Sequence, residues 1–150
     1  MKTIRSLGTS LIVAILLFRS PASHAQSDKR AVVLPPFGAW EIGGIWQPTK
    51  EDVAGLEASL EHISRLEAEN WPAKSGVHID HPERYFRQYI GVIRDWKLRI
   101  YVNAFCSDLQ PSPAWQRRLY QIMDGGTCAW QAIYDPSARR FLSLRINGVG

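Results

Sequence analysis

The hydrophobic pattern of this chain changes period once, and this change constrains the fold more than any other feature of the sequence. Between Thr49 and Leu66 the apolar residues recur at steps of three and four, the spacing of one face of an α-helix. From Arg84 onward short runs rich in Tyr, Ile, Val and Phe alternate with turn signals, as β-strands do. One helix before a run of strands predicts an α+β fold, with an amphipathic helix packed on an antiparallel sheet of four or five strands.

The expected helix has a start signal, an apolar stripe and a stop signal. Thr49 with Asp52 three residues later is the pattern of a capping box. Asn70 and Pro72 follow the point where the periodicity ends. The stripe that must be buried consists of Val53, Leu56, Leu60, Ile63 and Leu66.

The expected strands are separated by turns that contain Asp, Gly, Pro or Ser. The turns are Asp95-Trp96, Asp124-Gly125-Gly126 and Asp135-Pro136-Ser137. The strands are expected at 84–94, 97–106, 118–123, 127–135 and 140–147, and a further short strand at Ala31 to Leu34. A helix laid on such a sheet is similar in layout to cystatin-like and related small folds, an analogy of architecture that carries no functional implication.

The first 25 residues have the composition of a removable secretion signal. Lys2 and Arg5 precede an apolar run from Leu7 to Phe18, and Ser23-His24-Ala25 places small residues where a signal peptidase cleaves. An uncleaved membrane anchor is the alternative, but the run is shorter than the roughly 20 residues that span a bilayer. We therefore expect a signal peptide at 1–25, an irregular arm at 26–48 and one α+β domain at 49–150, secreted or periplasmic.

Removal of the signal changes the charge of the protein. The full chain has 18 Lys+Arg and 14 Asp+Glu, and loss of Lys2, Arg5 and Arg19 leaves 15 against 14, or +1. A net charge this close to zero does not support general binding of nucleic acid through its phosphates. No membrane association is expected after cleavage either.

Cys106 and Cys128 predict a disulfide, because an even number of cysteines in an exported chain is typical of paired thiols. The alternative is a nucleophilic cysteine assisted by His62, His78 or His81, although no cysteine-hydrolase motif surrounds either thiol. A disulfide needs Cα atoms within about 7 Å, which a simple meander through 118–123 does not allow. Either that segment is not an intervening strand, or the 107–117 loop crosses the sheet; the bond favours direct pairing of 97–106 with 127–135.

Alternation along the strands predicts a basic, aromatic surface opposite the helix. In 97–106 it separates Leu98, Ile100, Val102 and Ala104 from Lys97, Arg99, Tyr101, Asn103 and Phe105. The same outward face is expected to carry Arg87, Tyr89 and Gly91 from 84–94, and Phe141, Ser143 and Arg145 from 140–147. Asn103 has no evident packing role there, and Gly91 permits a bulge or a close approach. The binding residues predicted from this face are Arg87, Tyr89, Arg99, Tyr101, Asn103 and Arg145; the alternative is a wetted face of ordinary cross-strand pairs.

No catalytic motif is present in the sequence, so no catalytic residue and no cofactor are predicted. His78, Asp80 and His81 are weak candidates for a metal site, and a solvated loop is the favoured interpretation of them. The sequence therefore favours a small exported protein of binding or inhibitor type over an enzyme. Its partner would be a protein, peptide or glycan, and the basic face favours an acidic one. The alternatives are a small envelope hydrolase with a dispersed His/Asp site and a structural envelope component.

Overall fold

The computed structural model describes residues 29–35, 46–72, 75–109 and 111–149. The predicted signal segment, 1–25, lies outside these residues, as does most of the predicted arm, 26–48. The described parts of the arm are 29–35, which contributes a strand, and 46–48, which leads into the helix.

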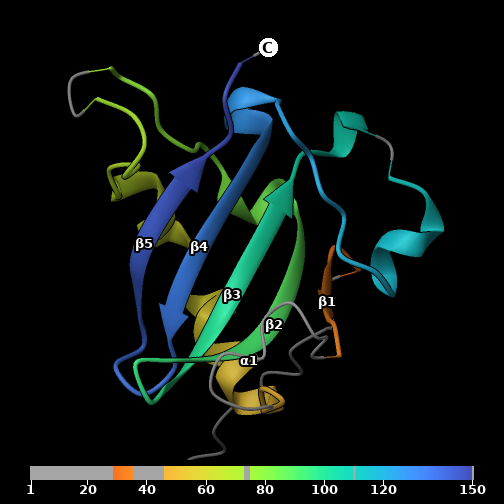
Figure 1. Cartoon of the computed structure of the whole chain (residues 1–150), viewed down its shortest axis with the longest axis vertical. Helices are drawn as coiled ribbons and strands as arrows, with labels where there is room; N and C mark the ends of the chain where they lie inside the picture. Colours follow the sequence, from red (N-terminus) through yellow and green to blue (C-terminus); the bar gives the residue numbers. More distant parts are fainter. Residues whose placement is uncertain (1–28, 36–45, 73–74, 110, 150) are drawn as a thin grey trace, which may run out of the picture.

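A five-stranded sheet forms the centre of the α+β fold (Figure 1). Its strands follow one another in sequence order: β1 (Ala31–Val33), β2 (Phe86–Arg94), β3 (Lys97–Phe105), β4 (Ala129–Asp135) and β5 (Arg140–Ile146). Neighbours from β2 to β5 are antiparallel, as predicted. The short strand β1 is parallel to β2, so the sheet is mixed and the expectation of a fully antiparallel sheet is wrong at this edge.

The helix α1 (Lys50–Ala58) begins at the predicted capping box. The Asp52 amide donates to Thr49 Oγ1 (3.2 Å), and the Thr49 amide donates to Asp52 Oδ2 (2.9 Å). These bonds satisfy amides that the first helical turn leaves without partners. The predicted apolar stripe packs into the core at all five positions: Val53, Leu56, Leu60, Ile63 and Leu66.

The α-helix is shorter than the periodicity predicted. It ends at Ala58, and the chain continues as a 3₁₀ helix, Leu60–Arg65. At the junction the Ser59 hydroxyl donates to the Gly55 carbonyl (2.8 Å), a back-bond that competes with helix geometry and bends helices. Steps of three and four fit both helix types here, so the stripe stays buried although the winding changes.

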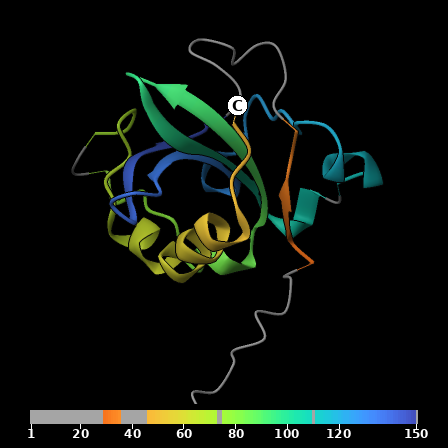
Figure 2. The ribbon, with the colours of Figure 1, turned by 90° about the horizontal axis from the view of Figure 1, so that it is seen from below.

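Helices cover one face of the sheet, and that interface holds the main core. Figures 1 and 2 show α1 and the 3₁₀ helix after it on the same side of the strands. From the sheet, the fully buried side chains in this core include Tyr89, Ile100, Val102, Trp130, Tyr134 and Leu144. Other short 3₁₀ helices are Pro82–Arg84, Ser107–Leu109, Pro113–Gln116 and Gly126–Cys128.

The disulfide and the direct pairing of β3 with β4 are both confirmed. Cys106 and Cys128 are bonded, with their Cα atoms 5.0 Å apart, and Phe105 pairs with Ala129 beside them. The predicted strand at 118–123 is wrong, because this segment has no strand partner and lies outside the sheet order. The connection 107–125 instead packs against the outward face of the sheet, where Phe105 contacts Trp115 and Tyr120.

Candidate functional site

The register of the sheet divides the predicted binding surface between two faces. Arg87 pairs with Ala104, and Tyr89 pairs with Val102, so both lie on the face that carries the helix. Both side chains are fully buried. The expectation that they share an outward surface with Arg99 is therefore wrong, because the two-residue turn at 95–96 fixes the opposite parity for β2.

Arg87 and Tyr89 tie the helix to the sheet. The Arg87 guanidinium forms an ion pair with Glu57 of α1, with Nη2 and Oε2 3.2 Å apart. Tyr89 donates to Glu57 Oε1, and Arg87 also donates to the carbonyls of Glu83 (2.8 Å) and Tyr85 (2.6 Å). Burial raises the pKa of Tyr89 well above its usual value, and the Glu57 carboxylate raises it further. The phenol therefore keeps its proton, and this buried group positions α1.

A bulge places Phe141 on the core side of β5. Ile133 pairs with Ser143 and Tyr134 pairs with Phe141, so Leu142 is an extra residue on β5. Phe141 is buried and packs edge-to-face on Tyr134, with ring centroids 5.1 Å apart. The expectation of an outward Phe141 is wrong, because the extra residue reverses the alternation between Phe141 and Ser143.

Gly91 is a point of close approach within the chain itself. A Cβ atom at this position would lie 2.3 Å from the Trp46 carbonyl oxygen. The Trp46 indole lies over the glycine, and its Nε1 donates to the carbonyls of Val92 (3.0 Å) and Arg99 (3.2 Å). Trp46 of the arm therefore fills the gap that the sequence left open for a partner.

Asn103 lies on the outward face as predicted, but it has a structural partner there. Its Nδ2 donates to Gln88 Oε1 (2.8 Å) and to the Tyr120 carbonyl (3.0 Å). Gln88 donates in turn to the carbonyls of Trp115 and Arg118 (2.5 and 2.7 Å). This buried pair of amides holds the 107–125 connection on the sheet, which corrects the inference that Asn103 has no packing role.

Tyr101 and Arg145 are the predicted site residues that remain accessible on the outward face. Tyr101 is half-buried and pairs with Ile133; Arg145 is exposed and pairs with Gln131. Burial raises the pKa of Tyr101 to about 12, against the opposing effect of the nearby Arg145 charge. These two side chains give the outward face its remaining basic and aromatic character.

Arg99 is buried at the end of the same face. Its Nη1 lies 3.1 Å from Asp135 Oδ2, and it also donates to the Leu98 carbonyl (2.8 Å). Hydrogen bonds from Ser137 and from the Ala138 amide, together with the Arg99 charge, lower the pKa of Asp135. The ionised pair braces the start of β3 against the turn that follows β4.

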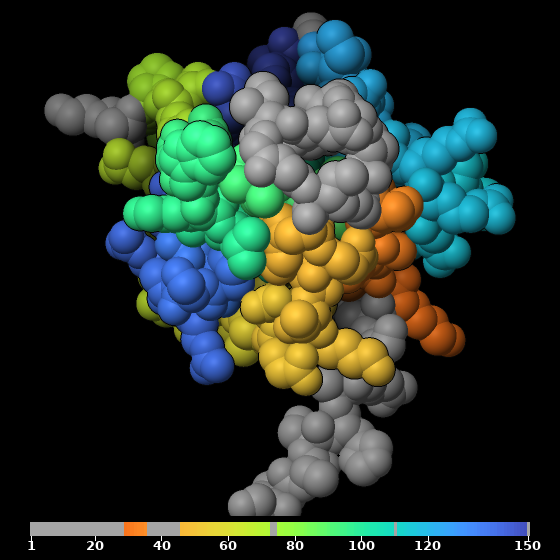
Figure 3. All heavy atoms as spheres, turned by 60° about the horizontal axis from the view of Figure 1, so that its bottom comes forward, coloured from red at the N-terminus to blue at the C-terminus, as the bar shows by residue number. Residues whose placement is uncertain are grey.

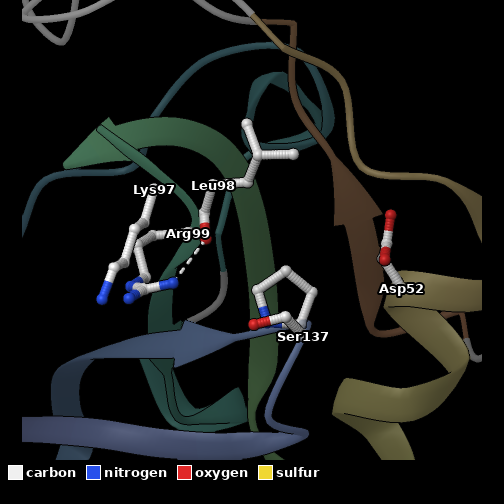
Figure 4. Close-up of a pocket in the computed structure, with 6 residues that line it drawn as sticks. Asp52, Lys97, Leu98, Arg99 and Ser137 are labelled. Atoms are coloured by element: carbon white, nitrogen blue, oxygen red, sulfur yellow. Dashed lines mark hydrogen bonds between the residues drawn. The ribbon is translucent and has the colours of Figure 1, made fainter. Parts of the chain in front are cut away.

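An open hollow of about 430 Å³ lies next to this ion pair. Figure 4 shows Asp52 on α1 to one side of the hollow, and the first residues of β3 on the other. The hollow is lined by Asp52, Lys97, Leu98, Arg99, Pro136 and Ser137. The turn from β2 to β3 and the turn from β4 to β5 therefore meet at one end of the molecule.

The most exposed aromatic residue of the described chain stands at this end. Trp96 is 94% exposed and lies in the β2–β3 turn with φ 59°, next to Asp95 with φ 51°. Sequence reasoning treated Asp95-Trp96 only as a turn; the signal it missed is a bulky aromatic where such turns favour glycine. We call residues 94–98, 136–140 and Leu142 the hairpin end.

The histidine candidates are not brought together. His78 pairs with Asp80 (Nε2 to Oδ1, 3.2 Å), whereas His81 pairs with Glu83 (Nδ1 to Oε1, 3.3 Å). All four side chains are more than half exposed. Within the described ranges, no group of three His, Cys, Asp or Glu side chains has the geometry to hold a metal ion.

Comparisons with known proteins give no relative. No family model, no curated protein and no solved structure matches this chain. In the part of the chain that the structure describes, no helix has the length and apolar character needed to cross a bilayer.

Proposed function

We propose that this chain is an exported binding protein without catalytic activity, and that it contacts its partner through the hairpin end. Tyr101 and Arg145 belong to the proposal as accessible outward-face residues of β3 and β5, whereas the buried Arg99 supports the hairpin end through its ion pair with Asp135. The helix-on-sheet layout, similar to that of cystatin-like folds, serves as the scaffold for this surface.

The observation that carries the proposal is the position of Trp96. A bulky residue in the left-handed region costs about 1 kcal/mol relative to the ordinary regions, and glycine avoids this cost. Trp96 also leaves nearly its whole indole in water, outside both buried clusters of the described residues. Tryptophan is the side chain most enriched at the centres of protein contacts. Packing within the described chain does not compensate for the backbone strain at Trp96, whereas contact of its indole with another molecule would do so.

Export is supported by the bonded pair Cys106 and Cys128. Disulfides form and persist in oxidising compartments and are rare in the cytosol. Together with the charged and apolar pattern of residues 1–25, the bond favours a chain that is folded after export.

The substitution Trp96→Gly separates binding from folding. Its free energy of unfolding should equal or slightly exceed that of the wild type, because relief of about 1 kcal/mol of backbone strain offsets the greater freedom of glycine in the unfolded chain. Affinity capture of cross-linked partners from the cell envelope should lose the specific products. Urea unfolding and mass spectrometry of the captured material measure the two effects.

Met123→Ala is the matched control, because Met123 is also large, apolar and 88% exposed but belongs to the 107–125 connection. It should retain the captured products. Equal capture by the wild type and the Trp96→Gly variant would remove the hairpin end from the proposal.

A further inference from the structure

We infer that the partner of the hairpin end is an anionic lipid surface. This inference rests on the proposed function and names the chemistry of the partner. It departs from the expectation, drawn from the sequence, that the processed protein does not associate with membranes.

The hairpin end exposes three large apolar side chains. Trp96 is 94% exposed, Leu98 48% and Leu142 41%, and these are three of the five large apolar side chains that the described chain exposes. The bulge in β5 supplies Leu142, and the left-handed turn supplies Trp96. Figure 3 shows the β2–β3 turn beside the β4–β5 turn, next to α1. Indole groups prefer the boundary between hydrocarbon and headgroups, and leucines can be buried just beyond it.

The same two turn regions carry exposed basic side chains. Arg94, Lys97, Arg139 and Arg140 are all exposed, and Asp95 is the one exposed acid among residues 94–98 and 136–140. None of the four bases forms an ion pair with another described residue. Each basic side chain near an anionic leaflet strengthens binding by about fivefold. Four positive charges in the regions that expose these apolar side chains are complementary to the negative charge of such a surface.

The small size of the hairpin end is compatible with shallow insertion into lipid. It contains eleven residues by the definition above, five in each turn region and Leu142. A standard protein interface uses about 20 to 30 residues on each side. Shallow insertion into lipid needs only a few apolar side chains and neighbouring positive charges, which this surface supplies.

The test uses the protein purified after export, with mass spectrometry confirming that residues 1–25 are absent, since the apolar run would itself insert into lipid. The protein is sedimented with vesicles of phosphatidylcholine alone and with vesicles of a phosphatidylglycerol and phosphatidylcholine mixture. We expect binding to the mixed vesicles, weakened by added salt, and little binding to phosphatidylcholine. Trp96→Gly should weaken binding about tenfold, and Met123→Ala should leave it unchanged.

The outcomes separate this inference from the proposed function. Absence of the wild type from the mixed-vesicle pellet overturns the lipid inference, as does equal pelleting of the wild type and Trp96→Gly. If the wild type does not pellet but cross-links to an envelope protein that Trp96→Gly does not capture, the hairpin end binds protein and the proposed function stands. Failure in both assays overturns both.

Discussion

The absence of a side chain at Gly91 lets the arm residue Trp46 lie directly against the sheet. The Trp46 backbone approaches so closely that a Cβ at position 91 would lie 2.3 Å from its carbonyl oxygen, a separation that real Cβ atoms do not show. The contact is with backbone, which cannot swing away as the end of a side chain can. Trp46 also donates to two strand carbonyls at this point, so a shift would weaken those bonds.

Gly91→Ala should therefore lower the free energy of unfolding by about 2 to 3 kcal/mol, as overpacking of a core does. Gly148→Ala is the control, because nothing lies within 4 Å of its added Cβ and it loses the same backbone freedom. Urea unfolding of both variants measures the difference. Equal stability of the two would show that Trp46 is not seated over the strand.

Interactions were predicted correctly where a pair of residue types specifies them. Thr49 with Asp52 and the two cysteines each form the predicted interaction. Arg87 was assigned to a binding surface from strand alternation and the enrichment of arginine at interfaces, and Asn103 because asparagine is depleted in strands. Their partners, Glu57 and Tyr120, are distant in sequence, and no local sequence pattern predicts such contacts.

At the scale of elements, side-chain amides on and beside the sheet hold the 107–125 connection in place by hydrogen bonds to its backbone carbonyls. Asn103 is 6% exposed and donates to Gln88 and to the Tyr120 carbonyl. Asn147 fixes the far end, donating to the carbonyls of Ile122 (2.6 Å) and Asp124 (3.2 Å). Loss of either amide leaves carbonyl oxygens without a donor.

Asn103→Leu should lower the free energy of unfolding by about 2 kcal/mol, since buried acceptors lose their partners. Amide hydrogen exchange should accelerate most in residues 115–120, where the connection lifts from the sheet. Ser143→Ala is the control on the same face, because the Ser143 side chain makes no hydrogen bond with a described residue. Uniform acceleration across the sheet would mean that the connection does not open separately.

The wrong assignments of residues to a face of the sheet came from the pairing register between neighbouring strands. The two-residue turn at 95–96 pairs odd positions of β2 with even positions of β3, which placed Arg87 and Tyr89 on the helix face. Loop length was visible in the sequence and suffices for this assignment. Loop length does not predict the bulge at Leu142 or the absence of a strand at 118–123, because tertiary contacts decide both.

At the scale of the whole molecule, the fold class was predictable because the change of period fixes one helical layer and one sheet. The cysteine pair favoured direct pairing of β3 with β4, which brings Cys106 and Cys128 within reach, but the order of the remaining strands was not predicted. The hairpin end was not predicted. It arises where two turns distant in sequence, at 95–96 and 136–139, meet across the sheet.

The disulfide connects the stability of the whole molecule to the proposed export. The bond closes a sequence separation of 22 residues, which the chain-entropy treatment converts into about 3 kcal/mol of stability. The paired variant Cys106→Ala with Cys128→Ala should lose that amount in urea unfolding and keep the fold, because the Cys106 amide still donates to the carbonyl at position 128 (2.8 Å). Reductant should lower the midpoint of the wild type to that of the variant and leave the variant unchanged. An unfolding midpoint that reductant does not move would show that the thiols are not paired in solution, and the argument for an oxidising compartment would lose its chemical support.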